Sequence, residues 1–184
     1  MKNVLLFFLK PLSFLPALIM MYVIYSFSAQ TGEASGNLSY EVSYKIVEIG
    51  NEILDKGLQE WEIQDYAHRI EYPVRKLAHM TEYFLLAIAV SFPFYVYGLR
   101  GFPLLLTAGI ICVGFAAGDE YHQSFVAGRG PSKKDVLIDS IGVFFGIMTV
   151  RITCWTFLAP FRFIGEVRER SRRKRMRKKT RRDY

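Results

Sequence analysis

The sequence is poor in cysteine and lacks the short motifs by which many enzymes are recognised. Its 184 residues include two cysteines, Cys112 and Cys154, and both lie in apolar runs. So few cysteines exclude a disulfide scaffold, and we expect both to be small buried side chains. The zincin helix motif, the serine-elbow pattern and a phosphate-cradling loop are also missing. No enzyme class follows from a signature motif, so the sequence leaves open whether the protein is an enzyme.

Charged residues are also scarce, and they are unevenly distributed. They make up 22% of the chain, against 51% hydrophobic and 15% aromatic residues, and so high an aromatic content excludes a disordered chain. The formal net charge is +7, but residues 162–184 alone hold twelve basic and three acidic residues and carry +9. Residues 1–161 therefore carry −2. Because the excess of basic over acidic residues is confined to this tail, we expect no nucleic-acid partner.

Four apolar runs predict transmembrane helices, since roughly 20 apolar residues cross the hydrocarbon of a bilayer. The predicted spans cover residues 4–27, 75–97, 102–119 and 136–158. The first run has an alternative interpretation as a cleaved signal peptide, because Lys2 and Lys10 precede an apolar stretch that ends in small residues. The predicted fold is an all-α integral membrane protein with four transmembrane helices.

Basic residues beside the spans predict their orientation. Lys2 and Lys10 lie at the beginning of the first span, Arg100 lies between the second and third, and the tail at 162–184 follows the fourth. Four spans place all of these on one side, and the positive-inside rule makes that side cytoplasmic. Both termini are then cytoplasmic. The membrane domain is 1–161, and anionic lipids would attract the basic tail by about 1 kcal/mol per basic residue.

The segment 28–74 faces outward in this topology and holds nine acidic and three basic residues. Apolar residues recur within it at helical spacing in two rows, Val42, Ile46, Ile49 and Ile53, and Val47, Leu54, Leu58 and Trp61. The rows predict an amphipathic helix of about six turns, although Gly50 and Gly57 weaken the pattern. We expect this helix to lie on the membrane or to pack on the spans, and the alternative is a lid over a site.

Ionisable residues inside a membrane are costly and therefore indicate function. In this chain they collect at the outer ends of the second, third and fourth predicted spans. Helical spacing places Arg75, His79 and Glu82 on one face of the second span. We predict a single polar cluster in the outer leaflet, formed by Arg75, His79, Glu82, Asp119, Glu120, Gln123, Arg129, Asp135 and Asp139.

Several chemistries fit this polar cluster. Arg75 and Arg129 would bind a phosphate or a carboxylate through bidentate contacts. A carboxylate pair in a dry site would act as acid and base. The candidates for holding a divalent metal are His79, Glu82, Asp119 and Asp139. In a third reading the polar side chains only set the packing of the helices.

The polar cluster also carries a resemblance to the VanZ-like family of bacterial membrane proteins. The matching pieces, in the family's order over residues 26–146, are Phe27-Ser28-Ala29-Gln30, Arg75-Lys76-x-x-His79-x-x-Glu82-Tyr83, Asp119-Glu120-x-x-Gln123-x-Phe125, Gly128-Arg129 and Asp135-Val136-x-x-Asp139-x-x-Gly142. The resemblance implies a multi-pass protein of the bacterial cell membrane that is linked to resistance to lipoglycopeptide antibiotics such as teicoplanin. It also implies that the nine residues of the polar cluster are the functional positions.

Two functional hypotheses follow. In the first, the polar cluster recognises the polar group of a membrane lipid, a cell-wall precursor or a lipoglycopeptide, with Arg75 and Arg129 on the anionic group. The residues expected to hold the arginines and His79 in place are Glu82, Asp119 and Asp139. In the second, the protein is an intramembrane hydrolase or transferase, metal-assisted or not, that acts on a lipid-linked substrate. The sequence does not identify a cofactor or an oligomeric state.

Overall fold

The structure is a computed structural model that describes residues 11–180, including the side chains of residues 11–157. Its elements are α2 (Leu15–Ser28), α3 (Gly32–Leu54), α4 (Glu60–Val96), α5 (Gly101–Gln123) and α6 (Lys133–Thr180). Every regular element in the described part of the chain is an α-helix, which confirms the predicted all-α fold.

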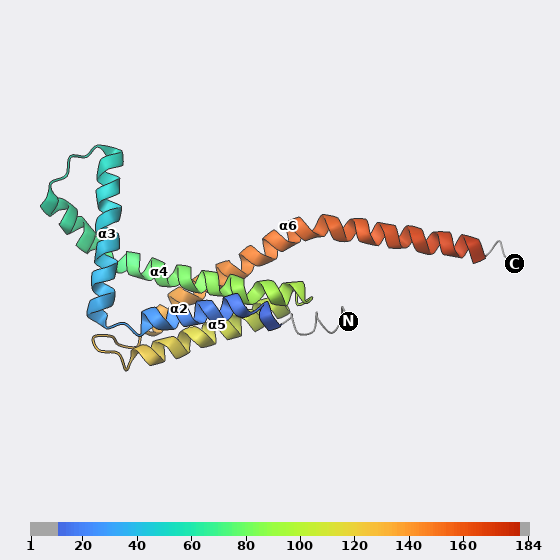
Figure 1. Ribbon diagram of the computed structural model, residues 1–184, viewed down its shortest axis with the longest axis horizontal. Helices are drawn as coiled ribbons and strands as arrows, with labels where there is room; N and C mark the ends of the chain where they lie inside the picture. Colours follow the sequence, from blue (N-terminus) through green and yellow to red (C-terminus); the bar gives the residue numbers. More distant parts are fainter. Residues whose placement is uncertain (1–10, 181–184) are drawn as a thin grey trace.

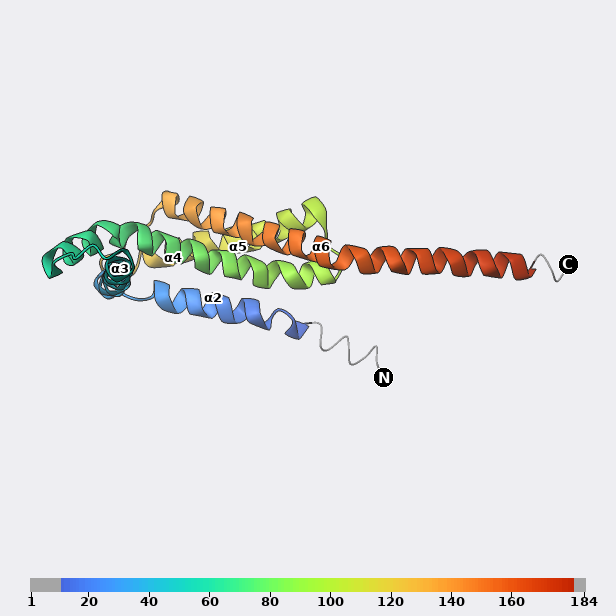
Figure 2. The same ribbon diagram turned by 90° about the horizontal axis from the view of Figure 1, so that it is seen from above.

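Four of the helices, α2, α4, α5 and α6, run side by side, and α3 stands across one end of them (Figure 1). The turned view shows α3 end-on, so the two views agree on this arrangement (Figure 2). The α5–α6 loop lies at the same end as α3. The α4–α5 turn lies at the opposite end, beyond which α6 extends as a long helix. The connections at the two ends of the bundle therefore differ in size and in character.

One hydrophobic core joins the four side-by-side helices. Its buried members come from all of them: Ala17 and Ile24 of α2, Tyr83, Leu86, Ala87 and Val90 of α4, Ala108, Cys112 and Ala116 of α5, and Val143 and Ile147 of α6. The outside of the bundle is apolar as well, and Leu18, Ile110 and Phe145 are each more than half exposed. An apolar exterior around an apolar core is typical of helices that face lipid.

Helix α6 approaches α4 closely because it presents glycine at the contact. A Cβ atom at Gly142 would overlap the Met80 carbonyl, and one at Gly146 would overlap the Phe84 carbonyl. Small residues at such contacts allow the backbones of membrane helices to approach each other. This packing brings the beginning of α6 against the part of α4 that carries His79.

The lengths of the helices agree with a membrane protein. In the described part of the chain, α4, α5 and the Lys133–Phe157 part of α6 are long and apolar enough to cross a bilayer, and α2 is a shorter apolar helix of 14 residues. The predicted spans at 102–119 and 136–158 lie within α5 and α6. The predicted first span includes residues 4–10, which lie outside the described residues.

The predicted amphipathic helix is present as α3, but it ends earlier than the periodicity indicated. It stops at Leu54 because Asp55 takes a left-handed conformation, with a φ of 48°. Gly57 also has a positive φ, of 61°, and the Asn51 side chain accepts a hydrogen bond from the Leu58 backbone at 3.0 Å. Leu58 therefore lies in the turn after α3.

Helix α4 begins at Glu60, well before the predicted start of the second span at residue 75. Its first turn is closed by a capping interaction, in which the Gln59 backbone N–H donates to Glu62 Oε2 at 2.8 Å. Trp61, which the periodicity placed on the amphipathic helix, consequently lies in the first turn of α4. The first part of α4 thus continues past the other helices and gives α3 a surface to pack on.

Candidate functional site

The α3 end of the bundle is held together by a backbone contact between α3 and the α5–α6 loop. Gly32, at the start of α3, donates a backbone hydrogen bond to the Ala127 carbonyl at 2.9 Å. The two backbones touch here, since a Cβ atom at Gly32 would overlap the Gly128 carbonyl. Gly128 has a φ of 75°, which favours glycine. The loop that carries Arg129 is therefore fixed against the start of α3.

A polar cavity of about 190 Å³ lies at this end of the bundle, where α3, α4, α5, the loop and α6 meet. Seven of the nine residues of the predicted polar cluster line it: Arg75, His79, Glu120, Gln123, Arg129, Asp135 and Asp139. Ser35 of α3 and Lys76 of α4 line it too. The polar cavity thus brings together cations and carboxylates from segments that are far apart in the sequence.

Ion pairs fix two of the cations in this cavity. Lys76 pairs with Asp135 and so joins α4 to α6. Arg75 pairs with Glu71 on the preceding turn of α4, and its Nε donates to Ser39 Oγ of α3 at 3.1 Å. The side chains of both pairs are at most 30% exposed, so salt screens them less than it screens a surface pair. Three helices are tied together around the cavity by these contacts.

Ser28, at the end of α2, forms a buried hydrogen-bond triangle with two residues of α5. Ser28 Oγ donates to Asp119 Oδ2 at 2.6 Å, and Gln123 Nε2 donates to the same oxygen at 3.0 Å. Gln123 Nε2 also lies 3.1 Å from Ser28 Oγ. All three residues are buried. Ser28 was missing from the predicted polar cluster, and its place in the family pattern was the signal that could have included it.

The carboxylates expected to hold the arginines have other partners. Glu82 Oε2 lies 3.4 Å from His79 Nδ1, as expected, whereas Asp119 accepts its hydrogen bonds from neutral side chains. Among the described residues, neither arginine forms an ion pair with Glu82, Asp119 or Asp139, so that part of the prediction is wrong. The reason is local, because a carboxylate one helical turn before Arg75 reaches it without crossing the cavity.

Arg129 has no carboxylate within ion-pair distance among the described residues. Its Nη2 donates to the Phe27 carbonyl at 3.4 Å, which is long for a hydrogen bond. Burial, and after it the charge of Arg75, lower the pKa of the Arg129 guanidinium from its ordinary value, although the carboxylates of Asp119, Glu120 and Glu82 act in the opposite direction. Two guanidinium groups thus line one partly enclosed space, in which an anion would be attracted by both.

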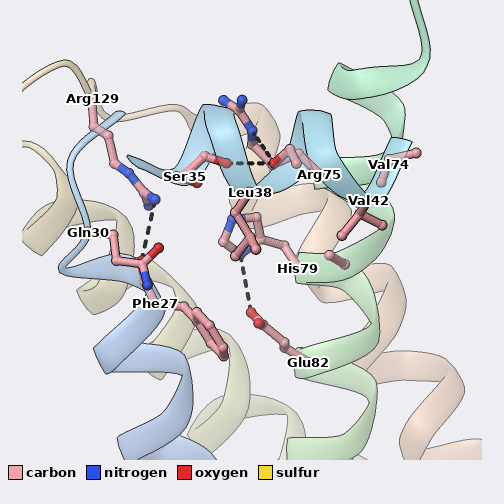
Figure 3. Close-up of a pocket in the computed structure, with 12 residues that line it drawn as sticks. Phe27, Gln30, Ser35, Leu38, Val42, Val74, Arg75, His79, Glu82 and Arg129 are labelled. Atoms are coloured by element: carbon pink, nitrogen blue, oxygen red, sulfur yellow. Dashed lines mark hydrogen bonds and ion pairs between the residues drawn. The ribbon is translucent and has the colours of Figure 1, made fainter. Parts of the chain in front are cut away.

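A second, apolar cavity of about 220 Å³ adjoins the polar one beneath α3 (Figure 3). Its apolar walls come from three helices: Phe27 of α2, Leu38 and Val42 of α3, and Val74 and Ala78 of α4. Glu82 lines this cavity as well. The residues that line both cavities are Ser35, Arg75, His79 and Arg129. These four side chains, which we call the shared belt, form the boundary between the polar cavity and the apolar cavity.

The four candidate metal ligands do not converge on one point. In the part of the chain that the structure describes, no group of three His, Cys, Asp or Glu side chains is arranged to hold a metal ion. His79 and Glu82 face each other, but Asp119 is engaged in the triangle with Ser28. The arrangement is better suited to an anion, which guanidinium groups bind through paired hydrogen bonds.

A protein-family model described as VanZ/LLP1 matches residues 13–158. The matched region includes α2 to α5, the apolar part of α6 and both cavities, and it leaves out the basic tail. No curated protein and no solved structure shows a significant match.

Proposed function

Because the chain belongs to the VanZ/LLP1 family, we propose that it is a bacterial envelope protein that binds the anionic group of a lipid, a cell-wall precursor or a lipid-anchored antibiotic. The anion lies in the polar cavity, between Arg75 and Arg129. The observation that carries this proposal is Arg129, a partly buried guanidinium that has no ion-pair partner among the described residues and shares its cavity with Arg75.

Charge and geometry both favour an anion at this point. The two guanidinium groups beside this space repel each other, and an anion between them would relieve that repulsion. The donor fork of arginine matches the paired oxygens of a phosphate or a carboxylate. Glu71 and Ser39 hold Arg75 from one side, so its position is fixed before the anion arrives. A site that is built in advance loses less entropy when it binds.

The family and the arrangement of charge together suggest where the protein acts. The basic tail lies at the far end of α6, and the positive-inside rule places it in the cytoplasm. The two cavities then face the extracytoplasmic side, where the protein meets antibiotics that arrive from outside. We therefore propose that anion binding at this site supports resistance to lipoglycopeptides of the teicoplanin type.

Arg129→Ala tests this proposal. In a strain whose teicoplanin resistance depends on this protein, the variant should lower resistance without lowering the amount of protein. Loss of a charged hydrogen-bond partner costs about 1.5–3 kcal/mol, which is roughly ten- to hundredfold in affinity. Arg69→Ala is the matched control, because Arg69 forms an exposed pair with Asp65 on α4 and lines neither cavity. Unchanged resistance in Arg129→Ala at equal protein level would overturn the assignment.

One observation supports the alternative of a hydrolase or transferase. His79 lines both cavities, with Glu82 Oε2 at 3.4 Å from its Nδ1 and with Asp139 on the wall of the polar cavity. An imidazole among carboxylates is suited to moving a proton. Purified protein incubated with phosphatidic acid would then release phosphate, and Glu82→Gln would stop the release while leaving binding in place. Binding without any release in the unaltered protein would contradict the alternative.

A further inference from the structure

We infer that the two adjoining cavities form one site for a membrane amphiphile, which places its anionic head group in the polar cavity and its hydrocarbon chain in the apolar cavity. This inference rests on the proposed function for the head group, and it adds the chain. The juxtaposition that carries it is the shared belt of Ser35, Arg75, His79 and Arg129, whose side chains line both compartments. A ligand held by the two arginines therefore lies at the entrance of the apolar cavity.

The apolar cavity is partly open, and we place its opening between α2 and α4, beneath α3. Figure 3 shows α2 on one side, α4 on the other and α3 across the top. Phe27, Leu38 and Val42 line the cavity and are 41%, 44% and 45% exposed, so its wall is continuous with the outer surface. That surface is apolar where the helices face lipid. A hydrocarbon chain leaving by this opening passes from the protein into the bilayer.

Helix α3 covers the apolar cavity and its opening. Leu38 and Val42 line the apolar cavity, and Ile46, Ile49 and Ile53 continue the same row along α3 with exposed side chains. The packing of α3 on α4 uses a different face of the helix, on which Ser43 is buried. The apolar row is therefore available for lipid along its whole length, beginning inside the cavity.

The size of the apolar cavity agrees with part of a chain. Its volume of about 220 Å³ is below that of pockets that enclose a whole drug-sized ligand, which begin at roughly 300 Å³. The cavity therefore encloses the methylene groups next to the head group, and the rest of the chain extends into lipid. Each methylene buried there should strengthen binding by about fourfold. A water-soluble anion gains nothing from this compartment.

Photo-crosslinking of the full-length protein in lipid nanodiscs tests the inference. The probe is phosphatidic acid with a photoreactive diazirine in its acyl chain near the head group, and labelled peptides are identified by mass spectrometry. We expect labelling of residues 38–42 and 74–78, on the two sides of the opening. Ala78→Phe should abolish it, because the added ring fills the apolar cavity from an exposed position. The control is Leu77→Phe, since Leu77 is 57% exposed and lines neither cavity.

Arg129→Ala in the same assay separates the inference from the proposed function. Loss of labelling in both Ala78→Phe and Arg129→Ala supports a single site for head group and chain. Loss in Arg129→Ala with full labelling in Ala78→Phe overturns the inference and leaves the proposed function standing. Loss in Ala78→Phe with full labelling in Arg129→Ala overturns the proposed function, because the chain would then bind without recognition of the head group.

A second measurement uses the unaltered protein and does not depend on the folding of any variant. Inorganic phosphate and water-soluble alkyl phosphates of increasing chain length compete with the probe. The affinity of the competitors should rise by about fourfold for each methylene until the apolar cavity is filled. Equal competition by inorganic phosphate and by the alkyl phosphates would identify a site for a free anion and overturn the inference.

Discussion

At the scale of single residues, buried charge has two different uses in this protein. The Oδ2 atom of Asp119 accepts hydrogen bonds from Ser28 and Gln123, so this carboxylate joins the end of α2 to α5. Among the described residues the Arg129 guanidinium forms one long hydrogen bond, to the Phe27 carbonyl, and no ion pair, so we propose that its charge serves a ligand. A residue of the first kind should affect stability, and a residue of the second kind should affect binding.

Asp119→Ala should destabilise the protein, because Ser28 and Gln123 then lose a shared buried acceptor. Leaving buried donors without a partner costs about 1–3 kcal/mol. Asp119→Asn keeps one acceptor oxygen and should cost less. Thermal unfolding in detergent measures the effect, and Arg129→Ala should unfold near the temperature of the unaltered protein. A pattern in which Arg129→Ala is the less stable variant would contradict this division of roles.

Gly142 is a position at which the absence of a Cβ atom should matter for stability. Gly142→Ala should lower the free energy of unfolding by about 1–3 kcal/mol, because the new methyl group meets the Met80 carbonyl on α4. Gly109→Ala is the control, since Gly109 has open space around it and alanine is the better helix former. Thermal unfolding and protein level measure both. Equal behaviour of the two variants would show that α4 and α6 do not depend on this contact.

At the scale of elements, α3 connects the other parts of the site. It packs on α4, its start is bound to the α5–α6 loop, and its apolar row begins in the apolar cavity. Figures 1 and 2 show it lying across the end of the bundle, which is the orientation of a helix in the plane of a membrane surface. Its acidic residues Glu41, Glu48 and Glu52 lie along one edge of the apolar row.

Spin labels on α3 test this orientation. A label at Ile46→Cys should be more accessible to oxygen, which dissolves in lipid, and a label at Glu41→Cys should be more accessible to a water-soluble nickel chelate. Ile46 belongs to the exposed apolar row, whereas Glu41, five residues earlier, points about 140° away from Ile46 around the helix. The native Cys112 and Cys154 are buried, which limits background labelling. The reverse order of accessibility would place the apolar row away from the membrane.

The positions of helices could be predicted where transfer of apolar side chains into lipid dominates. The ends of helices could not be predicted where they depend on the backbone conformation of a single residue. Long apolar runs located α5 and the membrane part of α6, because transfer into lipid depends on composition alone. The end of α3 depends on the left-handed backbone at Asp55, and apolar periodicity carries no information about that backbone. The predicted polar cluster was located by helical spacing, but the partner of Arg75 depended on which carboxylate its side chain reaches.

At the scale of the whole molecule, the two ends of the bundle differ in charge and in shape. One end has α3, the loop and both cavities, and the other has the α4–α5 turn and the extension of α6. The chain alternates between these ends as four spans require. From the distribution of basic residues we propose that the α6 extension lies in the cytoplasm and that the cavities lie on the opposite side of the membrane.

Reporters at the two ends test this topology. A fluorescent protein fused to Tyr184 should fold and fluoresce, as it does in the cytoplasm. A cysteine at Glu41 should react with a membrane-impermeant maleimide in intact cells. Maleimide labelling of Glu41→Cys only after the cells are broken would invert the topology, and the cavities would then face the cytoplasm.

The central claim is that Arg75 and Arg129 hold an anion between them. An experimental structure of the protein in native membrane lipid tests this most directly. We predict density for a phosphate- or carboxylate-sized group in contact with both guanidinium groups, continued by a chain that leaves between α2 and α4 beneath α3. Water alone between the two arginines, or a lipid whose head group lies outside the polar cavity, would contradict the claim.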